Sequence, residues 1–193
     1  MTRIRSRTVL RAAALAALLA AAPAAAFAQA PGDPAPRRAV SLMLGGLGTD
    51  VSEGRTFGIA AARADWRLSR WLLAETGLSY ARGEVELANH GTGTPTYSME
   101  PTALGTATVG VQAQLPLPLA QPYVGIATGL YLRLDRPGGH RFLSTTHEFP
   151  AGVRVPLTDR LGARAEVRLR YDQQQFQGQE LGAETTVGLT LRF

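Results

Sequence analysis

The sequence predicts an all-β fold, an eight-stranded antiparallel up-and-down transmembrane β-barrel. From residue 38 onward apolar and polar residues alternate with a period of two, and helical periodicity is nearly absent. The connections between the alternating segments are long and short in turn. One face of each segment is apolar and almost uncharged, whereas the other mixes glycine, small polar residues and charges of both signs.

The first 28 residues are predicted to be a cleaved signal peptide. Four arginines within the first eleven residues precede an Ala/Leu run, and Ala26 and Ala28 supply an A-x-A cleavage site. A membrane-anchoring helix is the competing interpretation, but the run is weakly apolar and shorter than the usual span of about 20 residues. Residues 29–37 then form a short periplasmic lead-in, and residues 38–193 form the barrel domain.

The charge of the chain depends on this segment. The chain has twenty Lys+Arg and fifteen Asp+Glu residues, a formal net charge of +5. Because the four arginines lie in the predicted signal peptide, the remaining chain is close to neutral. No basic run with interleaved aromatic residues is present, so the composition does not indicate nucleic-acid binding. The sequence has no cysteine, which excludes disulfides and thiol chemistry.

The alternation predicts eight strands, with boundaries good to a few residues. They are expected near 38–48, 55–67, 71–84, 101–115, 122–134, 145–156, 161–171 and 181–193. The segment "YVGIATGLYLRL" shows the pattern: Val124, Ile126 and Leu130 share one face, while Gly125, Tyr131 and other residues of odd number share the opposite face.

The connections predict how the strands are joined. Residues 68–70, 116–121 and 156–159 are short turns, whereas 85–100, 135–144 and 172–180 are long, and 49–54 is intermediate. In an up-and-down barrel this order places the long loops at one end and the tight turns at the other.

Three observations indicate that the apolar face points to lipid. That face lacks charge at the strand centres, where a soluble barrel would expose charged residues. The opposite face carries charges of both signs, which need partners when they are buried. Ten to twelve residues tilted by roughly 40° span about 25–30 Å, the thickness of a hydrocarbon core. The inward charges are Arg63, Asp65, Glu75, Arg133, Arg154, Arg164, Glu166, Arg168, Glu184 and Arg192.

Seven of these charged residues are predicted to form a network inside the barrel. They are Arg63, Asp65, Glu75, Arg154, Glu166, Arg168 and Glu184. The interior of an eight-stranded barrel is about wide enough for side chains to fill it. We therefore expect a packed ion-pair plug rather than a pathway for solutes.

Aromatic residues follow the same parity. Trp66, Tyr80 and Tyr171 fall on the apolar face near strand ends, where the interfacial girdles of a membrane barrel lie. Trp71 and Tyr123 have the opposite parity and are predicted to fill the lumen.

Two C-terminal segments resemble a known family. "GVRVPLTDRLGARAEVRLRYD" (152–172) is similar to the penultimate hairpin of small OmpA/OmpX-like outer-membrane barrels, and "TTVGLTLRF" resembles their closing strand with its terminal phenylalanine. The resemblance extends over 38–193 and is strongest in the C-terminal third. It implies residence in the outer membrane of a Gram-negative-type bacterium. It also implies that Val187, Leu189, Leu191 and Phe193 form a signal for the barrel assembly machinery.

Catalytic and metal sites are not indicated. The histidines are His90, His140 and His147, and the first two lie in predicted loops. His147 and Glu148 are adjacent on a strand and should point to opposite faces, so they do not suit a Ser–His–acid relay. The histidines and carboxylates lack the spacing of a metal site. We therefore predict no catalytic residue, no metal and no cofactor.

The sequence thus predicts a monomeric, non-enzymatic outer-membrane protein with a structural or surface-interaction role. Its partners would be outer-membrane lipid and lipopolysaccharide, with the predicted long loops making surface contacts. Two alternatives remain open. One is a lipid A-modifying barrel enzyme, and the other is a soluble periplasmic ligand-binding barrel whose apolar faces line a cavity.

Overall fold

A computed structural model describes the backbone of residues 38–49, 56–89, 96–134, 142–174 and 178–193. It describes their side chains as well, except at 49, 85–89, 96–100, 134, 142, 172–174 and 178–180. The predicted signal peptide and lead-in lie outside the described residues. Within the described part of the chain, no helix is long and apolar enough to cross a membrane.

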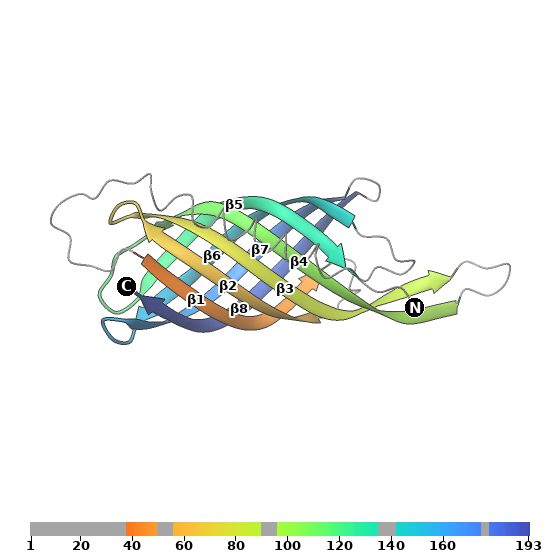
Figure 1. Cartoon of the computed structure of the whole chain (residues 1–193), viewed down its shortest axis with the longest axis horizontal. Coiled ribbons are helices and arrows are strands. Elements are labelled where there is room, and N and C mark those ends of the chain that lie inside the picture. The colour runs from red at the N-terminus through yellow and green to blue at the C-terminus, as the bar shows by residue number, and fades with distance from the viewer. Residues whose placement is uncertain (1–37, 50–55, 90–95, 135–141, 175–177) are drawn as a thin grey trace, which may run out of the picture. The chain divides into compact units, whose positions relative to one another are not determined.

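Eight strands close into one antiparallel barrel, as Figure 1 shows. They are β1 (Arg38–Thr49), β2 (Thr56–Arg67), β3 (Leu72–Asn89), β4 (Thr96–Gln114), β5 (Gln121–Leu134), β6 (Phe142–Pro156), β7 (Leu161–Gln174) and β8 (Gly178–Arg192). Each strand pairs with the next, and β1 pairs with β8. The predicted fold class and strand number are confirmed.

The pairing register fixes the tilt of the strands. A path that starts at Ala39 and steps from each residue to its partner passes through Asp65, Glu75 and the later strands and returns to β1 at Thr49. The return point lies ten residues further along β1. Ten residues of rise against eight strand spacings tilt the strands by about 40° from the barrel axis.

The first and last strands close the barrel. Val40 pairs with Leu191 and Leu47 pairs with Glu184. At the end of this ladder the backbone N–H of Arg38 donates to the carbonyl of Phe193 (3.1 Å), and the N–H of Phe193 donates to the carbonyl of Arg38 (3.0 Å). Closure leaves no unpaired sheet edge, which is the condition for placing strands in hydrocarbon.

Two of the tight turns use the same local device. In the β2–β3 turn the Ser69 hydroxyl accepts hydrogen bonds from the N–H groups of Trp71 (3.2 Å) and Leu72 (3.1 Å). In the β6–β7 turn the Thr158 hydroxyl accepts from Arg160 (3.3 Å) and Leu161 (2.9 Å). A hydroxyl that binds backbone N–H groups two and three residues ahead favours a turn over continued strand.

At the end of the barrel opposite the tight turns, the strands extend further than predicted. The expected long loops at 85–100, 135–144 and 172–180 all lose residues to the sheet. β3 continues to Asn89 and β4 begins at Thr96, β6 begins at Phe142, and β7 ends at Gln174 before β8 begins at Gly178. In Figure 1 the β3–β4 hairpin projects beyond the other strands. An antiparallel pair can continue outside a membrane without an apolar face, since only its ladder hydrogen bonds are needed. Polar composition alone therefore misplaced these boundaries.

The outer wall of the barrel is apolar. Exposed large side chains come from every strand except β2, and the exposed fraction reaches 68% at Leu42, 59% at Ile126 and 62% at Val187. The alternate residues of the same strands are buried inside. This is the reverse of a soluble ligand-binding barrel, so that alternative is wrong in its placement of the apolar faces.

Tyr80 and Tyr123 lie on the faces predicted for them, whereas Trp71 does not. Tyr80 is on the outer wall and 48% exposed, while Tyr123 is only 3% exposed in the lumen. Trp71 was expected in the lumen but is 43% exposed, and the Arg70 guanidinium lies 4.6 Å from its ring centroid. The prediction was wrong because Trp71 precedes β3 and belongs to the turn, where strand parity does not apply.

Candidate functional site: an ion-pair network in the lumen

The lumen contains a dense group of charged side chains contributed by five strands. Five arginines face five carboxylates, so the formal charge of the group is zero. The members are Arg63, Asp65, Glu75, Glu148, Arg154, Arg164, Glu166, Arg168, Arg170 and Glu184. We call this group the lumen network. Each member is at most 8% exposed.

Arg164 on β7 lies at the centre of the part of the network that is nearer the tight turns. Its Nη2 lies 2.5 Å from Glu75 Oε2 and 2.5 Å from Glu166 Oε2, and its Nη1 lies 3.2 Å from Asp65 Oδ2. Its Nε donates to the Tyr123 hydroxyl (2.8 Å), which in turn donates to Glu166 (2.6 Å). One guanidinium thus joins carboxylates from β2, β3 and β7.

Arg168 lies four residues beyond Arg164 on β7 and also contacts three carboxylates. It donates to Glu148 Oε2 (2.6 Å), to Glu75 Oε1 (2.7 Å) and to Glu166 Oε1 (2.9 Å). Because Arg164 and Arg168 share Glu75 and Glu166, the two guanidiniums and two carboxylates form an alternating cluster. Such charge-assisted bonds offset part of the desolvation cost that each buried ion carries.

The remaining members connect the cluster to the rest of the wall. Arg63 Nη2 donates to Glu184 Oε1 (2.7 Å) and its Nη1 donates to the backbone carbonyl of Leu78 (3.0 Å). Arg170 Nε lies 3.6 Å from Glu148. Arg154 Nη2 donates to Asp65 (3.1 Å).

Neutral groups extend the network. The side-chain oxygen of Gln112 accepts a short hydrogen bond from Arg154, and its amide nitrogen donates to Glu75 (2.6 Å). Tyr123 lies beneath two guanidiniums, with ring-centroid distances of 3.9 Å to Arg154 and 5.0 Å to Arg164. These cation–π contacts place an aromatic ring in an otherwise ionic layer.

Two lumen glycines provide the space that the long side chains occupy. A Cβ atom at Gly77 would lie 2.9 Å from Arg63 Nη1, and a Cβ atom at Gly152 would lie 2.6 Å from the Tyr123 hydroxyl. Both distances are shorter than real Cβ contacts. Glycine at these positions therefore makes room inside a barrel whose interior is only as wide as its side chains.

All seven residues predicted for the lumen lie there, and Glu148, Arg164 and Arg170 are three members outside the predicted set. Arg164 was assigned to the inward face without being given a central role. Glu148 enters the sequence prediction only as a neighbour of His147, and Arg170 does not enter it. A parity signal was available for each, since Arg164, Arg168 and Arg170 alternate along β7 and Glu148 has the parity of Arg154 on β6.

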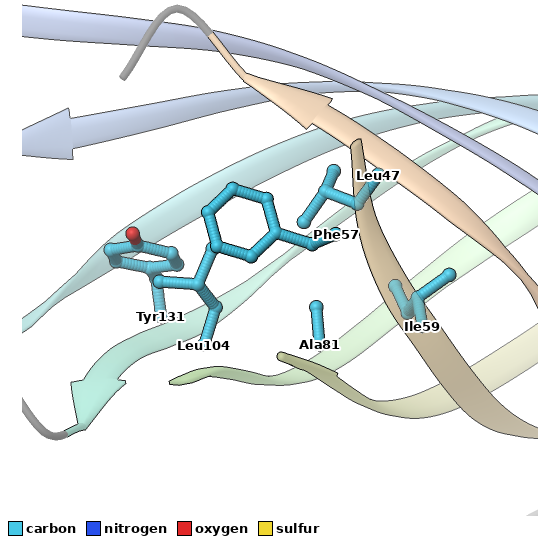
Figure 2. Close-up of a cluster of buried hydrophobic side chains, with 6 residues drawn as sticks. All are labelled: Leu47, Phe57, Ile59, Ala81, Leu104 and Tyr131. Atoms are coloured by element: carbon cyan, nitrogen blue, oxygen red, sulfur yellow. The ribbon is translucent and has the colours of Figure 1, made fainter. Parts of the chain in front are cut away.

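The long-loop end of the lumen is filled differently. Figure 2 shows a buried apolar cluster, which we call the apolar cap. Its members are Leu47, Phe57, Ile59, Ala81, Leu104 and Tyr131, each at most 4% exposed. The cap meets the lumen network where the Arg170 guanidinium lies 5.8 Å from the Tyr131 ring centroid.

Other predicted residues lie on the outer wall. His147 is exposed there, with Nδ1 3.1 Å from the Thr128 hydroxyl, whereas Glu148 points into the lumen and is 1% exposed. The predicted separation of these two side chains is confirmed. His90 and His140 lie outside the described residues. Among the described residues no group of three or more His, Cys, Asp or Glu side chains suits a metal ion.

The four residues predicted to form an assembly signal lie in one outward row that runs along β8 and ends just after it. Val187, Leu189, Leu191 and Phe193 are all exposed on the outer wall, at 53–62%. Phe193 follows the last strand residue, at the end of the barrel where the tight turns lie.

Comparison with solved structures identifies the architecture. A crystal structure of Neisserial surface protein A matches with a TM-score of 0.64 at 15% sequence identity, over 81% of this chain and 97% of that chain. This chain has the fold of the small eight-stranded outer-membrane β-barrels. The outer membrane protein OprG from Pseudomonas aeruginosa matches with a TM-score of 0.54 at 9% identity, over 84% of this chain and 98% of that chain.

A third match is Ail, the attachment invasion locus protein of Yersinia pestis, in a complex with the heparin analogue sucrose octasulfate. Its TM-score is 0.52 at 10% identity, over 81% of this chain and 97% of that chain. No protein-family model and no curated protein sequence matches the chain. The similarity is therefore one of fold.

Proposed function

We propose that this protein is a monomeric, non-enzymatic outer-membrane barrel with a structural or surface-interaction role, whose lumen is closed by its own side chains. The observation that carries the proposal is the separation of charge from apolar surface. Large apolar side chains cover the outer wall, and ten charged side chains are paired within the lumen. A protein with this distribution is stable only where its exterior meets hydrocarbon.

The closed lumen is supported by the contents of the barrel at two levels. The neutral lumen network occupies the part nearer the tight turns, and the apolar cap occupies the part nearer the long loops. An ion that entered would have to break paired, hydrogen-bonded charges and then pass an apolar layer, and both steps are costly. The network would thus brace the wall and block solute passage.

The surface role is supported by the arrangement of the connections. The tight turns lie at one end with both ends of the strand array, and the extended β3–β4 hairpin projects at the other. Two similar structures are named as a surface protein and an attachment invasion locus protein. We place the long connections outside the cell, where they would contact lipopolysaccharide or other surfaces. Val187, Leu189, Leu191 and Phe193 would be read by the barrel assembly machinery.

Fractionation tests the location. The protein is expected in outer membranes after carbonate extraction, and without boiling it should migrate on a gel as a compact species, because a closed hydrogen-bonded barrel resists detergent. Release into the soluble periplasmic fraction would contradict the proposal.

Two further measurements test closure and the absence of catalysis. Purified protein in planar bilayers should show no large, long-lived single-channel conductance, and a stable open channel would show that the lumen is not closed. A mass spectrum of lipid A from cells with and without the protein should be unchanged. A new lipid A species would favour the lipid A-modifying alternative.

A further inference from the structure

A groove lies in the outer wall of the barrel, over β4, β5 and β6. It has a volume of about 490 Å³, within the range of ~300–1,000 Å³ that is typical of small-molecule sites. Its lining is mostly apolar, with two polar side chains among those that face outward. The outward-facing residues of the lining are Val109, Val111, Ile126, Thr128, His147 and Phe149. We call this feature the wall groove.

The sheet is interrupted beneath the wall groove. Pairing of β5 with β6 stops at Val124 and resumes at Ala127. Pro150 of β6 lies opposite this gap, and proline has no N–H to donate to a neighbouring strand, so it is normally excluded from the interior of a sheet. Ile126 and Phe149, which would pair within the gap, both line the groove. The wall groove therefore coincides with a break in the backbone ladder and is more than a space between side chains.

One end of the wall groove reaches the edge of the apolar band. His147 lies nine residues before Pro156, the last residue of β6 at the tight-turn end. At about 3.3 Å per residue and a tilt of about 40°, His147 is about 23 Å from that end along the barrel axis, and the apolar band of a membrane barrel is ~25 Å tall. Its cross-strand neighbours Thr128 and Tyr171 are also polar. The groove therefore runs from a polar row at the long-loop side into the hydrocarbon region.

The hydrogen bonds of Thr128 determine the tautomer of His147. The Thr128 hydroxyl donates to the backbone carbonyl of Thr146 (3.2 Å), and its oxygen lies 3.1 Å from His147 Nδ1. Because a hydroxyl has one proton, both bonds form only if the Nδ1–H of His147 donates to Thr128. Nε2 then carries a lone pair and is an acceptor, and no described residue donates to it.

The wall groove thus suits an occupant that is apolar along its length and has a donor at one end. An acceptor without a donor is costly beside hydrocarbon. An unsubstituted ester-linked acyl chain has carbonyl acceptors and no donor, whereas a hydroxyl near the headgroup end of the chain supplies one. A second copy of this barrel would bring another apolar wall, which would leave Nε2 without a donor.

We propose that the wall groove binds a hydroxylated acyl chain of lipopolysaccharide. The chain lies along Val111, Ile126 and Phe149, and its hydroxyl donates to Nε2 of His147. This inference rests on the proposed function, because it requires that the long-loop end of the barrel face the outside of the cell. Fractionation measures the location of the protein independently, so failure of the groove and failure of the proposed function give different results.

The test uses the protein purified from membranes and placed in phospholipid nanodiscs. Two photoactivatable lipids are compared. They share a headgroup, a chain length and a diazirine at the chain end, but only one carries a hydroxyl on the third carbon of the labelled chain. Mass spectrometry measures the labelling of peptides from β4, β5 and β6, and of peptides from β8, which does not line the groove.

The hydroxylated lipid is expected to label the groove strands about fivefold more than the plain lipid, which is the ratio that one net hydrogen bond of about 1 kcal/mol gives. The two lipids should label β8 equally. Equal labelling of the groove strands by the two lipids would overturn the proposal, because it would show ordinary boundary lipid, with water as the partner of Nε2.

Three variants test the hydrogen bond. His147→Leu removes the acceptor and keeps the wall apolar, so the preference for the hydroxylated lipid should fall to about one. Thr128→Val removes the hydroxyl that orients the imidazole, and it should lower the preference without changing labelling by the plain lipid. Thr185→Val, which removes an exposed hydroxyl from the outer face of β8, is the control and should keep the preference. A preference that persists in His147→Leu, or that is lost equally in Thr185→Val, would overturn the assignment to His147.

Two matched variants test the groove itself. Val111→Phe places a ring in the groove and should reduce labelling of the groove strands by the hydroxylated lipid to the level found on β8. Val167→Phe makes the same change on the outer face of β7, away from the groove, and should leave that labelling unchanged. Equal labelling in the two variants would show that the lipid does not occupy the groove.

Folding and oligomeric state are checked separately. Gel migration without boiling shows whether each variant is a closed barrel, and if His147→Leu did not fold, Thr128→Val would decide the role of the hydrogen bond. Analytical ultracentrifugation in detergent is expected to show a monomer. A stable dimer that Val111→Phe dissociates and Val167→Phe does not would mean that a second copy covers the groove, and it would overturn the proposal.

Discussion

The two halves of the lumen are built from inward-facing residues of the same strands, yet they are filled in opposite ways. The lumen network contains ten charged side chains, whereas the apolar cap contains none. On β2, Phe57 and Ile59 belong to the cap, and Arg63 and Asp65 belong to the network. Parity therefore determines that a residue faces inward, but it does not determine whether its surroundings are ionic or apolar.

The difference shows what each half requires for stability. The network is stable because its charges have partners from several strands, so its energy depends on the barrel being closed in one register. The cap needs only volume and shape, since apolar packing is not directional. In the closed barrel, the lumen network therefore favours one strand register, and the apolar cap excludes water.

The largest expected effect comes from removing one of the two arginines that each contact three carboxylates. Arg168→Met leaves Glu75, Glu148 and Glu166 each without one partner, and it should lower the free energy of unfolding by about 3–5 kcal/mol, less whatever lumen water recovers. Urea unfolding in lipid vesicles, followed by tryptophan fluorescence, measures this loss. Arg160→Met, in an exposed turn, is the control. Equal small losses in both variants would mean that the lumen charges are solvated rather than paired.

A charge on the outer wall tests whether partners, and not position alone, stabilise the network. Val167 lies next to Arg168 on β7 but faces outward and is 47% exposed. Val167→Arg should cost about 2–4 kcal/mol near the centre of the bilayer, because no carboxylate is available in hydrocarbon. Leu130→Arg, nearer the long-loop end of β5, should cost less. Refolding titrations into lipid check both values. If Val167→Arg did not change the free energy of unfolding, the inner and outer faces would be assigned the wrong way round.

The apolar cap should respond to lost volume. Phe57→Ala is expected to cost about 2–3 kcal/mol, somewhat below the usual range for a buried phenylalanine, because the cap lies beside the end of the barrel and can relax. Phe57→Leu should cost only about 1 kcal/mol. The same urea titration compares the two variants. Equal costs would show that the ring does not support the long-loop end through its packing.

The smallest expected effect on refolding concerns an aromatic residue at the opposite end and on the opposite face. Phe193→Ala keeps the backbone pair with Arg38, so spontaneous folding into detergent should lose about 1 kcal/mol or less. If Phe193 also marks the chain for assembly, insertion into the outer membrane of cells should fall far more. Parallel measurements separate the two roles. Unchanged insertion in cells would remove Phe193 from the assembly signal.

Local patterns in the sequence were sufficient for the architecture. Alternation in "YVGIATGLYLRL" correctly assigned the two faces of β5, and the unequal connections correctly placed the turns at one end. Closure between β1 and β8 also followed, because an open edge is not stable in lipid. The sequence predictions were wrong at positions where the local alternation does not determine the structure. Trp71 was assigned by strand parity although it belongs to a turn, and β3 and β4 continue past the residues expected to form a loop.

The sequence by itself determined the direction of each strand residue and the number of strands, because a strand alternates its side chains regardless of what surrounds it. Only the tertiary structure decided which inward charges meet. The shift of ten residues around the barrel brings Glu75 of β3 level with Arg164 and Arg168 of β7, which are far apart in the chain. Register is a property of the closed sheet, so the ion pairs and the apolar cap are fixed by closure and not by any single strand.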